Sequence, residues 1–205
     1  MRMKKHLLDG GFLDYTDDFL SKEDADLLFE TLIKYAPWKQ EQYGKYPQPR
    51  LTAWYAEPGM SYTYSGVTHS PYEFTQELID LKNKIEESIK YFNPKFEGYN
   101  SVLLNQYRHG KDSVGYHADD EKELGDNPNI ASISLGATRK FMLQHYKTAS
   151  GKLPDHEPIE YDLKHGSLLI MSGTIQKYWK HSIPKTKSNV GPRINLTFRR
   201  FYNIK

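Results

Sequence analysis

The amino-acid sequence predicts an α+β fold that is mainly β, with antiparallel sheets packed as a sandwich or jelly roll and helices buttressing the outside. Amphipathic helical patterns occupy the first half of the chain, whereas short strand-like runs fill the second half. The two patterns do not alternate, which argues against a parallel α/β sheet. No Gly/Ser-rich or Pro-rich stretch divides the 205 residues, so we expect a single domain over 1–205.

Two helices are expected before residue 95. Ser21 can cap the N-terminus of the first helix, whose apolar pattern ends at Pro37. The second helix is expected to begin near Pro71 and to end near Asn93. Its apolar residues, spaced by three or four positions, are Phe74, Leu78, Leu81, Ile85 and Ile89. Both helices are expected to cover one face of a sheet.

From Tyr99 onward the apolar period shortens to that of strands, with Gly, Pro and Asn between the runs. The predicted strands are 101–107, 130–135, 140–146, 158–163, 167–172 and 193–202. No internal repeat is evident.

Composition narrows the class of protein and the kind of site. The chain has no cysteine, so a metal ion must be held by His and carboxylate side chains. The net charge is only +2, so any nucleic-acid surface must be local. The basic start is followed by just two leucines, unlike a secretory signal, and no run of about 18 apolar residues occurs. We expect an intracellular protein without membrane contact, cytoplasmic in a prokaryote or nuclear in a eukaryote.

Three residues combine the ligand types of a non-haem iron site. His117 and Asp119 are two positions apart, so their side chains point to the same side of an extended segment. His181 supplies a third ligand. Two His and one carboxylate leave positions of Fe(II) open for a bidentate co-substrate and O2. Zinc can use such ligands too, and a lone His-x-Asp also occurs by chance.

The strand predicted near the C-terminus carries a polar face. Alternation sends the apolar side chains to one side and the polar ones to the other. The polar residues are Arg193, Asn195, Thr197 and Arg199. The two arginines lie roughly 20 Å apart, at about 3.3 Å per residue, and need not bind the same group. An arginine near a His-rich site fits a dicarboxylate whose other end chelates iron, such as 2-oxoglutarate.

Asn105 and Tyr107 share one face of another predicted strand. Their amide and phenol groups can hydrogen-bond the same co-substrate, and the alternative for Tyr107 is an ordinary core position.

In combination, these motifs resemble the AlkB family of Fe(II)/2-oxoglutarate-dependent dioxygenases. The matching motifs are Asn105-x-Tyr107, His117-x-Asp119, His181 and Arg193-x-Asn195-x-Thr197-Phe198-Arg199. The likeness extends from about Tyr43 to Phe201, with little contribution from residues 1–40. It is expected to be greatest to the nuclear DNA-repair member that prefers double-stranded DNA.

The resemblance implies a double-stranded β-helix (jelly roll) core and oxidative demethylation of N-alkylated DNA bases, chiefly 1-methyladenine and 3-methylcytosine. Hydroxylation of the N-methyl group would release formaldehyde, with succinate and CO2 as co-products. Fe(II) would be bound by His117, Asp119 and His181, with 2-oxoglutarate and O2 as co-substrates. The residues implied to bind 2-oxoglutarate are Asn105, Tyr107, His181, Arg193, Asn195, Thr197 and Arg199. Residues 40–100 would form the nucleotide-recognition lid and its supporting helix.

Further segments match the substrate-handling parts of this family. They are Tyr43-Gly44-Lys45, Tyr62-Thr63-Tyr64 and Asp120-Glu121. A base inside a duplex must be flipped out to reach an iron centre, and aromatic side chains can fill the gap and hold the base. Tyr43 resembles the aromatic finger that fills the gap, and Tyr62 and Tyr64 resemble the pocket wall. The alternative for Tyr43 is a solvent-exposed loop tyrosine.

Charged residues near these segments fit a nucleic acid. Lys45 and Arg50 are expected to meet phosphates. Asp120 would favour a cationic methylated base, although a solvated acidic turn is the alternative. The basic loop 183–189, together with Lys111, Arg139 and Lys140, would add positive charge to one face.

Two other functions remain open at this stage. The same chemistry could act on methylated RNA, a lipid or a protein side chain. A non-catalytic nucleic-acid-binding module could also keep this fold, with His117 and His181 as core histidines. We expect a monomer that acts on alkylated DNA, single- or double-stranded.

Overall fold

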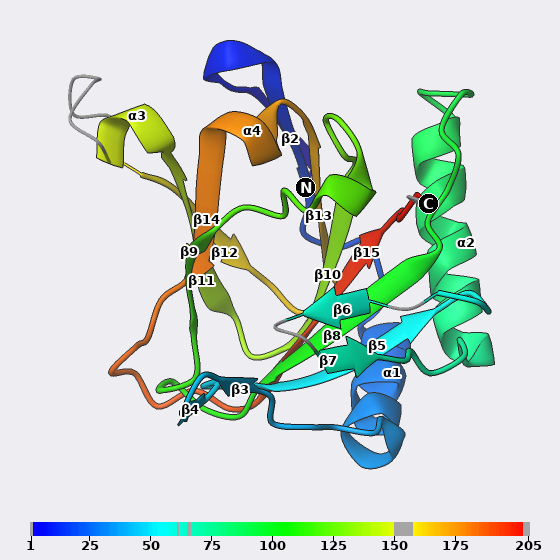
Figure 1. Cartoon of the computed structure of the whole chain (residues 1–205), viewed down its shortest axis with the longest axis vertical. Coiled ribbons are helices and arrows are strands. Elements are labelled where there is room, and N and C mark those ends of the chain that lie inside the picture. The colour runs from blue at the N-terminus through cyan, green and yellow to red at the C-terminus, as the bar shows by residue number, and fades with distance from the viewer. Residues whose placement is uncertain (1, 61, 65–66, 150–157, 203–205) are drawn as a thin grey trace.

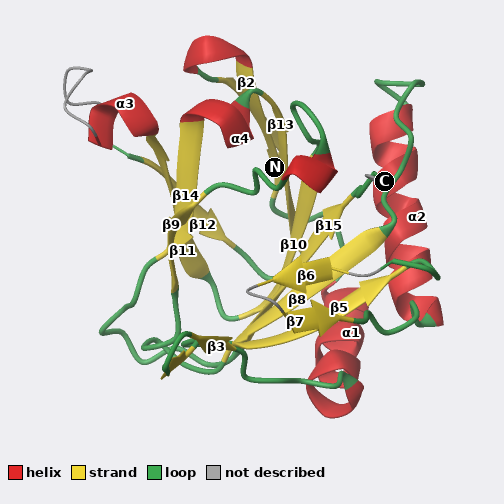
Figure 2. Cartoon of the chain, in the orientation of Figure 1, coloured by secondary structure: helices red, strands yellow, loops and turns green. Residues whose placement is uncertain are grey.

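The core of the structure is a pair of antiparallel sheets lying opposite each other, as the sequence predicts (Figures 1 and 2). The computed structural model describes residues 2–60, 62–64, 67–149 and 158–202, and only the backbone at 2, 43, 62–64, 67–69 and 148–149. The strands of the larger sheet are β1 (Arg2–His6), β2 (Gly11–Thr16), β5 (Leu51–Ala56), β8 (Ser101–Tyr107), β10 (Ile130–Gly136), β13 (Ser167–Gly173) and β15 (Arg193–Arg199). The strands of the smaller sheet are β9 (Val114–His117), β11 (Arg139–His145), β12 (Ile159–Leu163) and β14 (Trp179–Ile183).

Strand order defines how the sheets are built. The larger sheet has the order β1-β2-β13-β10-β15-β8-β5 and the smaller sheet β12-β11-β14-β9. Neighbours in both sheets are antiparallel, and most are distant in sequence, as in a jelly roll. All six predicted strands are present. The last one is shorter than predicted, because the side-chain amide of Asn100 hydrogen-bonds the backbone N–H and carbonyl of Phe201 beyond Arg199.

Two small hairpins stand apart from the sheets. They are β3 (Gln42–Tyr43) with β4 (Tyr46–Pro47), and β6 (Tyr62–Tyr64) with β7 (Val67–His69). Gly44 takes a φ of 59° in the two-residue turn between β3 and β4, a conformation that glycine adopts without steric cost. Within the segment 40–100, β5 lies between the two hairpins in sequence and pairs with β8 in the larger sheet, and the role of the segment as a nucleotide-recognition lid with its supporting helix stays a prediction.

Two long helices cover one face of the larger sheet. The first is α1 (Lys22–Tyr35), and the hydroxyl of its cap Ser21 accepts from the backbone N–H of Asp24 at 3.0 Å, as predicted. The second, α2 (Gln76–Lys90), begins later than predicted, because Tyr72 is held extended by backbone hydrogen bonds to Trp54 and Ala56 of β5. Two single-turn helices, α3 (Tyr146–Ala149) and α4 (Ile175–Tyr178), and two 3₁₀ turns, η1 (Leu8–Gly10) and η2 (Lys122–Leu124), complete the described elements.

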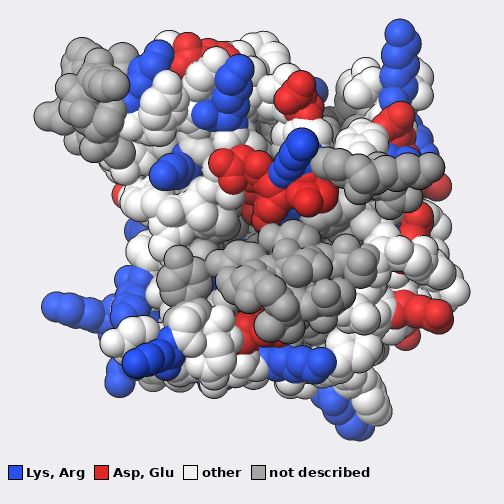
Figure 3. Space-filling model, viewed as in Figure 1, with Lys and Arg blue, Asp and Glu red and all other residues white. Residues whose placement is uncertain are grey.

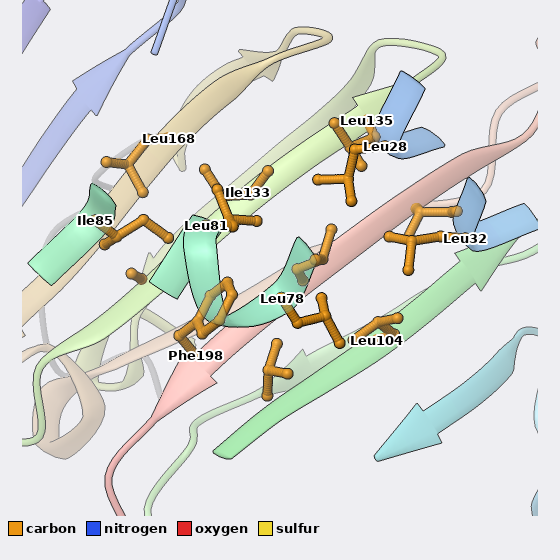
Figure 4. Packing of buried hydrophobic residues seen from close by; sticks show 14 of the residues in the cluster. Leu28, Leu32, Leu78, Leu81, Ile85, Leu104, Ile133, Leu135, Leu168 and Phe198 are labelled. Carbon is orange, nitrogen blue, oxygen red and sulfur yellow. The ribbon is translucent and has the colours of Figure 1, made fainter. Parts of the chain in front are cut away.

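The helices pack on the sheet through a continuous apolar layer (Figure 4). The side chains that Figure 4 labels in this layer are Leu28, Leu32, Leu78, Leu81, Ile85, Leu104, Ile133, Leu135, Leu168 and Phe198. Each fully buried side chain of this size contributes about 1.5–3 kcal/mol to folding. None of the described helices is long and apolar enough to span a membrane. The layer leaves the opposite face of the larger sheet turned toward the smaller sheet.

A second apolar cluster fills much of the space between the sheets. Leu13, Leu169 and Met171 of the larger sheet pack there with Phe141 and Leu143 of the smaller one. Along β8 and β15 the inner face is polar instead, with Asn105, Tyr107 and the four residues predicted from alternation. The interior is therefore apolar at one end and polar at the other.

Candidate metal and co-substrate site

A cavity opens where the polar strands of the larger sheet face the smaller sheet. Its empty space, including the mouth, is about 530 Å³. Polar lining residues of the larger sheet are Asn105, Tyr107, Ser132, Asn195, Thr197 and Arg199, and the smaller sheet contributes His117, Phe141 and His181. Asp119 and Arg50 complete the polar lining. Every predicted 2-oxoglutarate residue except Arg193 therefore lines one cavity.

The three predicted metal ligands converge in this cavity. Their ligand atoms lie within 4.8 Å of one another. His117 ends β9 and is the cross-strand partner of His181 on β14, so the two imidazoles share the inner face, with ring centroids 4.3 Å apart. Asp119 follows β9 by two residues, and its carboxylate oxygens lie 4.0 Å from His117 Nε2 and 3.7 Å from His181 Nε2.

The tautomer of His117 suits a metal ligand. Its Nδ1 is 2.9 Å from the carbonyl of Gly115, and because a carbonyl only accepts, Nδ1 carries the proton. In the neutral imidazole this tautomer leaves the lone pair on Nε2, on the side of Asp119. Metal-binding histidines are commonly oriented by such a hydrogen bond from the other ring nitrogen.

Asp119 is fixed by hydrogen bonds to its backbone and to one carboxylate oxygen, whereas its other oxygen has no hydrogen-bond partner among the described residues. Asp119 is buried, with 3% of its surface exposed. The backbone N–H of Asp119 donates to Gln176 Oε1 at 2.9 Å, and its Oδ1 accepts from Arg199 Nη2 at 2.5 Å. Oδ2 is buried without a hydrogen-bond partner among the described residues, on the side of His181 Nε2. A buried carboxylate oxygen facing two imidazole nitrogens fits a cation bound between them.

Burial and neighbouring charges keep Asp119 and His181 in the protonation states that bind a metal. Burial favours the neutral form of Asp119, but Arg199 and the two histidines outweigh it, so the pKa of this carboxyl is lowered. Burial also lowers the pKa of His181 to about 3, against the opposing effect of Asp119. The carboxylate is therefore ionised and His181 is neutral at neutral pH.

We expect the stability of the metal-free protein to fall as the pH drops from about 6.5 toward 3. The pKa of His181 is about 3 in the fold and 6.5 in the reference state, so the unfolded chain takes up the proton first and acid favours unfolding. One such group contributes at most about 1.4 kcal/mol per pH unit. Urea unfolding at several pH values measures this slope. His181→Gln should show a shallower slope, and equal slopes in both proteins would contradict the assignment.

Arg193 lies deeper than the other polar residues of β15. It is 0% exposed, and its Nη2 donates to Ser134 Oγ at 2.8 Å and to Asn195 Oδ1 at 2.9 Å. Its Nε and Nη1 have no hydrogen-bond partner among the described residues. Burial lowers the pKa of Arg193 to about 10, so it stays charged at neutral pH. A buried cation with two unused donors fits the carboxylate of a bound acid.

The two arginines of β15 occupy different surroundings. Arg199 lies against the metal ligand Asp119, whereas Arg193 stacks on Tyr107, its guanidinium carbon 5.3 Å from the ring centroid. Between them, the Asn195 amide bonds Ser132 and Arg193 through Oδ1 and Thr197 through Nδ2. The two arginines therefore lie at different ends of the site, Arg199 near the metal ligands and Arg193 near Tyr107, so they need not bind the same group.

Arg50 makes a contact that the sequence did not predict. It lines the cavity and donates from Nε to Asn105 Oδ1 at 2.8 Å, while its expected contact with a phosphate stays a prediction. The reason is the pairing of β5 with β8, in which Leu51 faces Gln106 and Thr52 faces Asn105. This register brings the preceding residue, Arg50, to the end of β8.

The other predicted substrate residues lie around the site to different extents. Gly44 and Lys45 form the exposed turn of the β3–β4 hairpin, whereas the side chain of Tyr43 and those of Tyr62, Thr63 and Tyr64 lie outside the described part. Asp120 is exposed and directly follows the metal ligand. Burial raises the pKa of Glu121, against the effect of Arg199. Acidic side chains gather around η2 in the centre of Figure 3.

The predicted basic face is smaller than expected. Arg139 is 3% exposed and donates to the backbone carbonyls of Asp112 and Pro184 at 2.9 and 2.6 Å, so it cannot meet a phosphate. Lys140 pairs with Glu160 at 2.9 Å. Figure 3 nevertheless shows Lys and Arg gathered at lower left, where Figure 1 places β3, β4 and the loop after β14.

Two residues of the site lie outside the motifs that were recognised in the sequence. Gln176 on α4 is buried and holds the backbone of Asp119, and Phe141 on β11 stacks on His181 with ring centroids 5.4 Å apart. The inward position of Phe141 could be inferred from its alternation with Leu143. Nothing in the local sequence distinguishes Gln176, because its partner lies 57 positions away.

Sequence comparison agrees with the class of protein that this fold and site define. Residues 12–199 match the profile of the 2OG-Fe(II) oxygenase superfamily, so the match begins well before Tyr43. The chain belongs to this superfamily and, within it, to the AlkB homologues. Its cofactor is Fe(II), with 2-oxoglutarate and O2 as co-substrates, and the donor set described above fits them.

Individual relatives support this assignment. Bovine alpha-ketoglutarate-dependent dioxygenase alkB homolog 3 is 44% identical over 90% of this chain and 64% of its own length. Mouse DNA oxidative demethylase ALKBH2 is 37% identical over 98% of this chain and 85% of its own length. The chain thus spans about two thirds of the homolog 3 proteins, and identity to them exceeds identity to ALKBH2. The comparisons therefore do not single out the double-strand-preferring member.

Solved structures support the fold alone. The structure of OsALKBH1 has a TM-score of 0.65 at 17% identity, covering 97% of this chain and all of that one. A prolyl hydroxylase from Trichoplax adhaerens, solved with a hypoxia inducible factor peptide, has a TM-score of 0.62 at 12% identity, covering 92% of this chain and 83% of that one.

Proposed function

We propose that this protein is an oxidative demethylase that repairs N-alkylated DNA bases, 1-methyladenine and 3-methylcytosine, and releases the methyl group as formaldehyde. The observation that carries the proposal is the similarity to mouse DNA oxidative demethylase ALKBH2, which extends over 98% of this chain. The triad, the arginine-bearing strand and the hairpins near the cavity all fall within that span.

The chain supplies geometry and charge to this reaction. Bound Fe(II) would activate O2 for hydroxylation, coupled to conversion of 2-oxoglutarate into succinate and CO2. His117, Asp119 and His181 would hold the metal on one side and leave the opposite side open. Arg193, Tyr107 and Asn105 would orient the co-substrate from the larger sheet, and Phe141 shields His181 from water. The methyl group needs no general base from the protein.

Charge near the metal supports a cationic substrate. 1-Methyladenine and 3-methylcytosine carry positive charge near neutral pH, and a nearby carboxylate stabilises a cation. Asp120 is exposed directly beside the ligand Asp119, and Glu121 follows it. We propose that this acidic pair favours the methylated base over its neutral, unmethylated form.

The β3–β4 hairpin supports a role in base flipping. Its turn is exposed and carries Lys45, a suitable phosphate contact, next to Tyr43. Extracting a base from a duplex costs a few kcal/mol, and a stacked aromatic side chain can offset part of that cost. We propose that Tyr43 occupies the gap left by the flipped base, and that Tyr62 and Tyr64 line its pocket.

A demethylation assay on matched oligonucleotides tests the function. Single- and double-stranded DNA and single-stranded RNA of one sequence would each carry one 1-methyladenine or 3-methylcytosine. We expect formaldehyde release from DNA that requires both Fe(II) and 2-oxoglutarate. Faster turnover of the RNA would contradict the DNA assignment but leave the chemistry intact. Absence of both turnover and uncoupled succinate formation would favour the binding module.

Tyr43→Ala is expected to reduce turnover of duplex DNA about tenfold and that of single-stranded DNA less than about twofold. One stacked base is worth about 1–3 kcal/mol, and 1.4 kcal/mol corresponds to a factor of ten. Only the duplex has a gap to fill. Steady-state kinetics on both substrates measure the difference, with Tyr43→Phe as the control that keeps the ring. Equal losses on both substrates would argue against a finger.

A further inference from the structure

Arg50 connects the β3–β4 hairpin to the co-substrate end of the cavity. It lies between the hairpin and β5, and the pairing of β5 with β8 brings it close to Asn105 and Tyr107. Its Nε–H donates to Asn105 Oδ1 at 2.8 Å, and both side chains line the cavity. The backbone before it is anchored, because the carbonyl of Pro49 accepts from the N–H of Ser113 at 3.0 Å.

This hydrogen bond fixes the orientation of the Asn105 amide. A guanidinium group only donates, so the amide atom that faces Arg50 must be the oxygen. The Nδ2 group then points away from Arg50, and no hydrogen bond joins it to another described residue. Asn195, in the same cavity, differs because its Oδ1 and Nδ2 are both bonded within the protein. Asn105 therefore offers a preoriented, unused donor to an acceptor in the cavity.

The surroundings of Arg50 indicate what that acceptor is. Arg50, Arg193 and Arg139 all lie near Tyr107, and each lowers the pKa of its phenol against the effect of burial. Three cations around one end of a cavity favour an anion there. The metal ligands occupy the other end, so an acid that spans both ends matches the cavity.

We propose that Arg50 is a positioning residue for 2-oxoglutarate, which acts by holding the Asn105 amide with its NH2 group toward the co-substrate. The proposal rests on the use of 2-oxoglutarate by this site and not on the nature of the methylated substrate. It replaces the phosphate contact expected from the sequence. It also makes the hairpin and the co-substrate site neighbours along the chain, joined by residues 48–50.

A double-mutant cycle on 2-oxoglutarate binding tests the proposal. The Mn(II)-loaded protein would be titrated with 2-oxoglutarate by calorimetry, without nucleic acid, for Arg50→Met, Asn105→Ala and the double variant. Each single variant is expected to bind about tenfold more weakly, as for loss of a hydrogen bond to a charged group. The double variant should bind no more weakly than Asn105→Ala, because Arg50 acts through Asn105. Multiplied losses in the double variant, or unchanged affinity in Arg50→Met, would overturn the proposal.

Two control variants distinguish a positioning role of Arg50 from a general effect of its positive charge, and thermal melting checks that each variant is folded. Lys95→Met removes an exposed positive charge outside the cavity and should leave 2-oxoglutarate affinity unchanged. Arg50→Lys keeps the charge but lacks the planar Nε–H, so it should lose most of the affinity that Arg50→Met loses. Full affinity in Arg50→Lys would overturn the geometric role. Thermal melting of each variant verifies that it is folded before titration.

Oligonucleotide binding provides an independent readout. A phosphate contact contributes about one unit to the slope of log affinity against log salt. Arg50→Met should keep the wild-type slope, since Arg50 faces the cavity. A slope reduced by about one, together with unchanged 2-oxoglutarate affinity, would overturn the proposal in favour of a phosphate contact. Because the calorimetric arm needs no DNA, failure of the demethylase assignment would not affect it.

Discussion

Asp119→Ala is expected to lower 2-oxoglutarate-dependent formaldehyde release at least about 100-fold while the protein stays folded. Changes beyond the direct ligands of a metal already cost 10–100-fold in affinity or activity, and Asp119 is the single anionic ligand of the triad. Its loss also leaves Arg199 without the carboxylate that it contacts. Formaldehyde and succinate formation, measured with methylated DNA, give the size of the effect.

Control variants separate metal loss from general damage. His181→Ala should lose activity to a similar extent, because it removes another ligand. Asp126→Ala removes an exposed carboxylate a few residues further along the same loop, and wild-type activity is expected. Titration with Mn(II), followed by electron paramagnetic resonance, should show weak binding only in the two ligand variants. Undiminished formaldehyde release from either ligand variant would disprove the triad.

Positions in the candidate site could be predicted from the sequence where the residues lie in a short, regular pattern. Alternation predicts that Arg193, Asn195, Thr197 and Arg199 share the inner face of β15. In the structure the last three line the cavity, and Arg193 lies beside them against Asn195 and Tyr107. The helix α1 and the strand β8 were also predicted closely, since a serine cap and a short strand-like run are local signals. The metal triad combines a local pair with one distant histidine, so its prediction needed the resemblance to a family.

The rest depends on contacts between distant segments. Strands β1, β2, β5, β9 and β14 were not predicted. β1 is a charged edge strand, and β9 and β14 are short and become strands by pairing with each other at the metal site. The contact of Arg50 with Asn105 could not be predicted for the same reason, because it spans 55 positions and depends on the register of β5 with β8.

Several buried polar atoms without a hydrogen-bond partner among the described residues lie at this site. Buried groups that lack a hydrogen bond cost free energy, and a fold without ligands has no reason to retain them. Asp119 Oδ2, Arg193 Nε and Nη1, and Arg199 Nε are all of this kind among the described residues. They lie in or next to one cavity and divide into an anionic metal end and a cationic end. This distribution predicts that removing such a group weakens binding without weakening the fold.

Arg193→Met is therefore expected to weaken 2-oxoglutarate binding at least about 30-fold without lowering the stability of the ligand-free protein. Truncating one partner of a buried charged pair costs about 2–5 kcal/mol in affinity, and 2 kcal/mol corresponds to about 30-fold. In the ligand-free protein the same substitution removes a fully buried charge that has no acidic partner in the described structure, which favours folding. This gain in stability offsets the loss of the hydrogen bonds to Ser134 and Asn195. Calorimetry of the Mn(II)-loaded protein and urea unfolding measure the two effects.

Arg139 offers the matched comparison, because it is also a buried arginine beside Tyr107. Its guanidinium carbon lies 5.7 Å from the Tyr107 ring centroid, against 5.3 Å for Arg193. Unlike Arg193, it bonds the backbone carbonyls of Asp112 and Pro184, so Arg139→Met should destabilise the fold by about 1.5–3 kcal/mol. If Arg193→Met destabilises the protein as much as Arg139→Met and leaves 2-oxoglutarate affinity unchanged, Arg193 is a structural residue. Weaker 2-oxoglutarate binding by Arg193→Met, without loss of stability, would show that Arg193 serves co-substrate binding rather than folding.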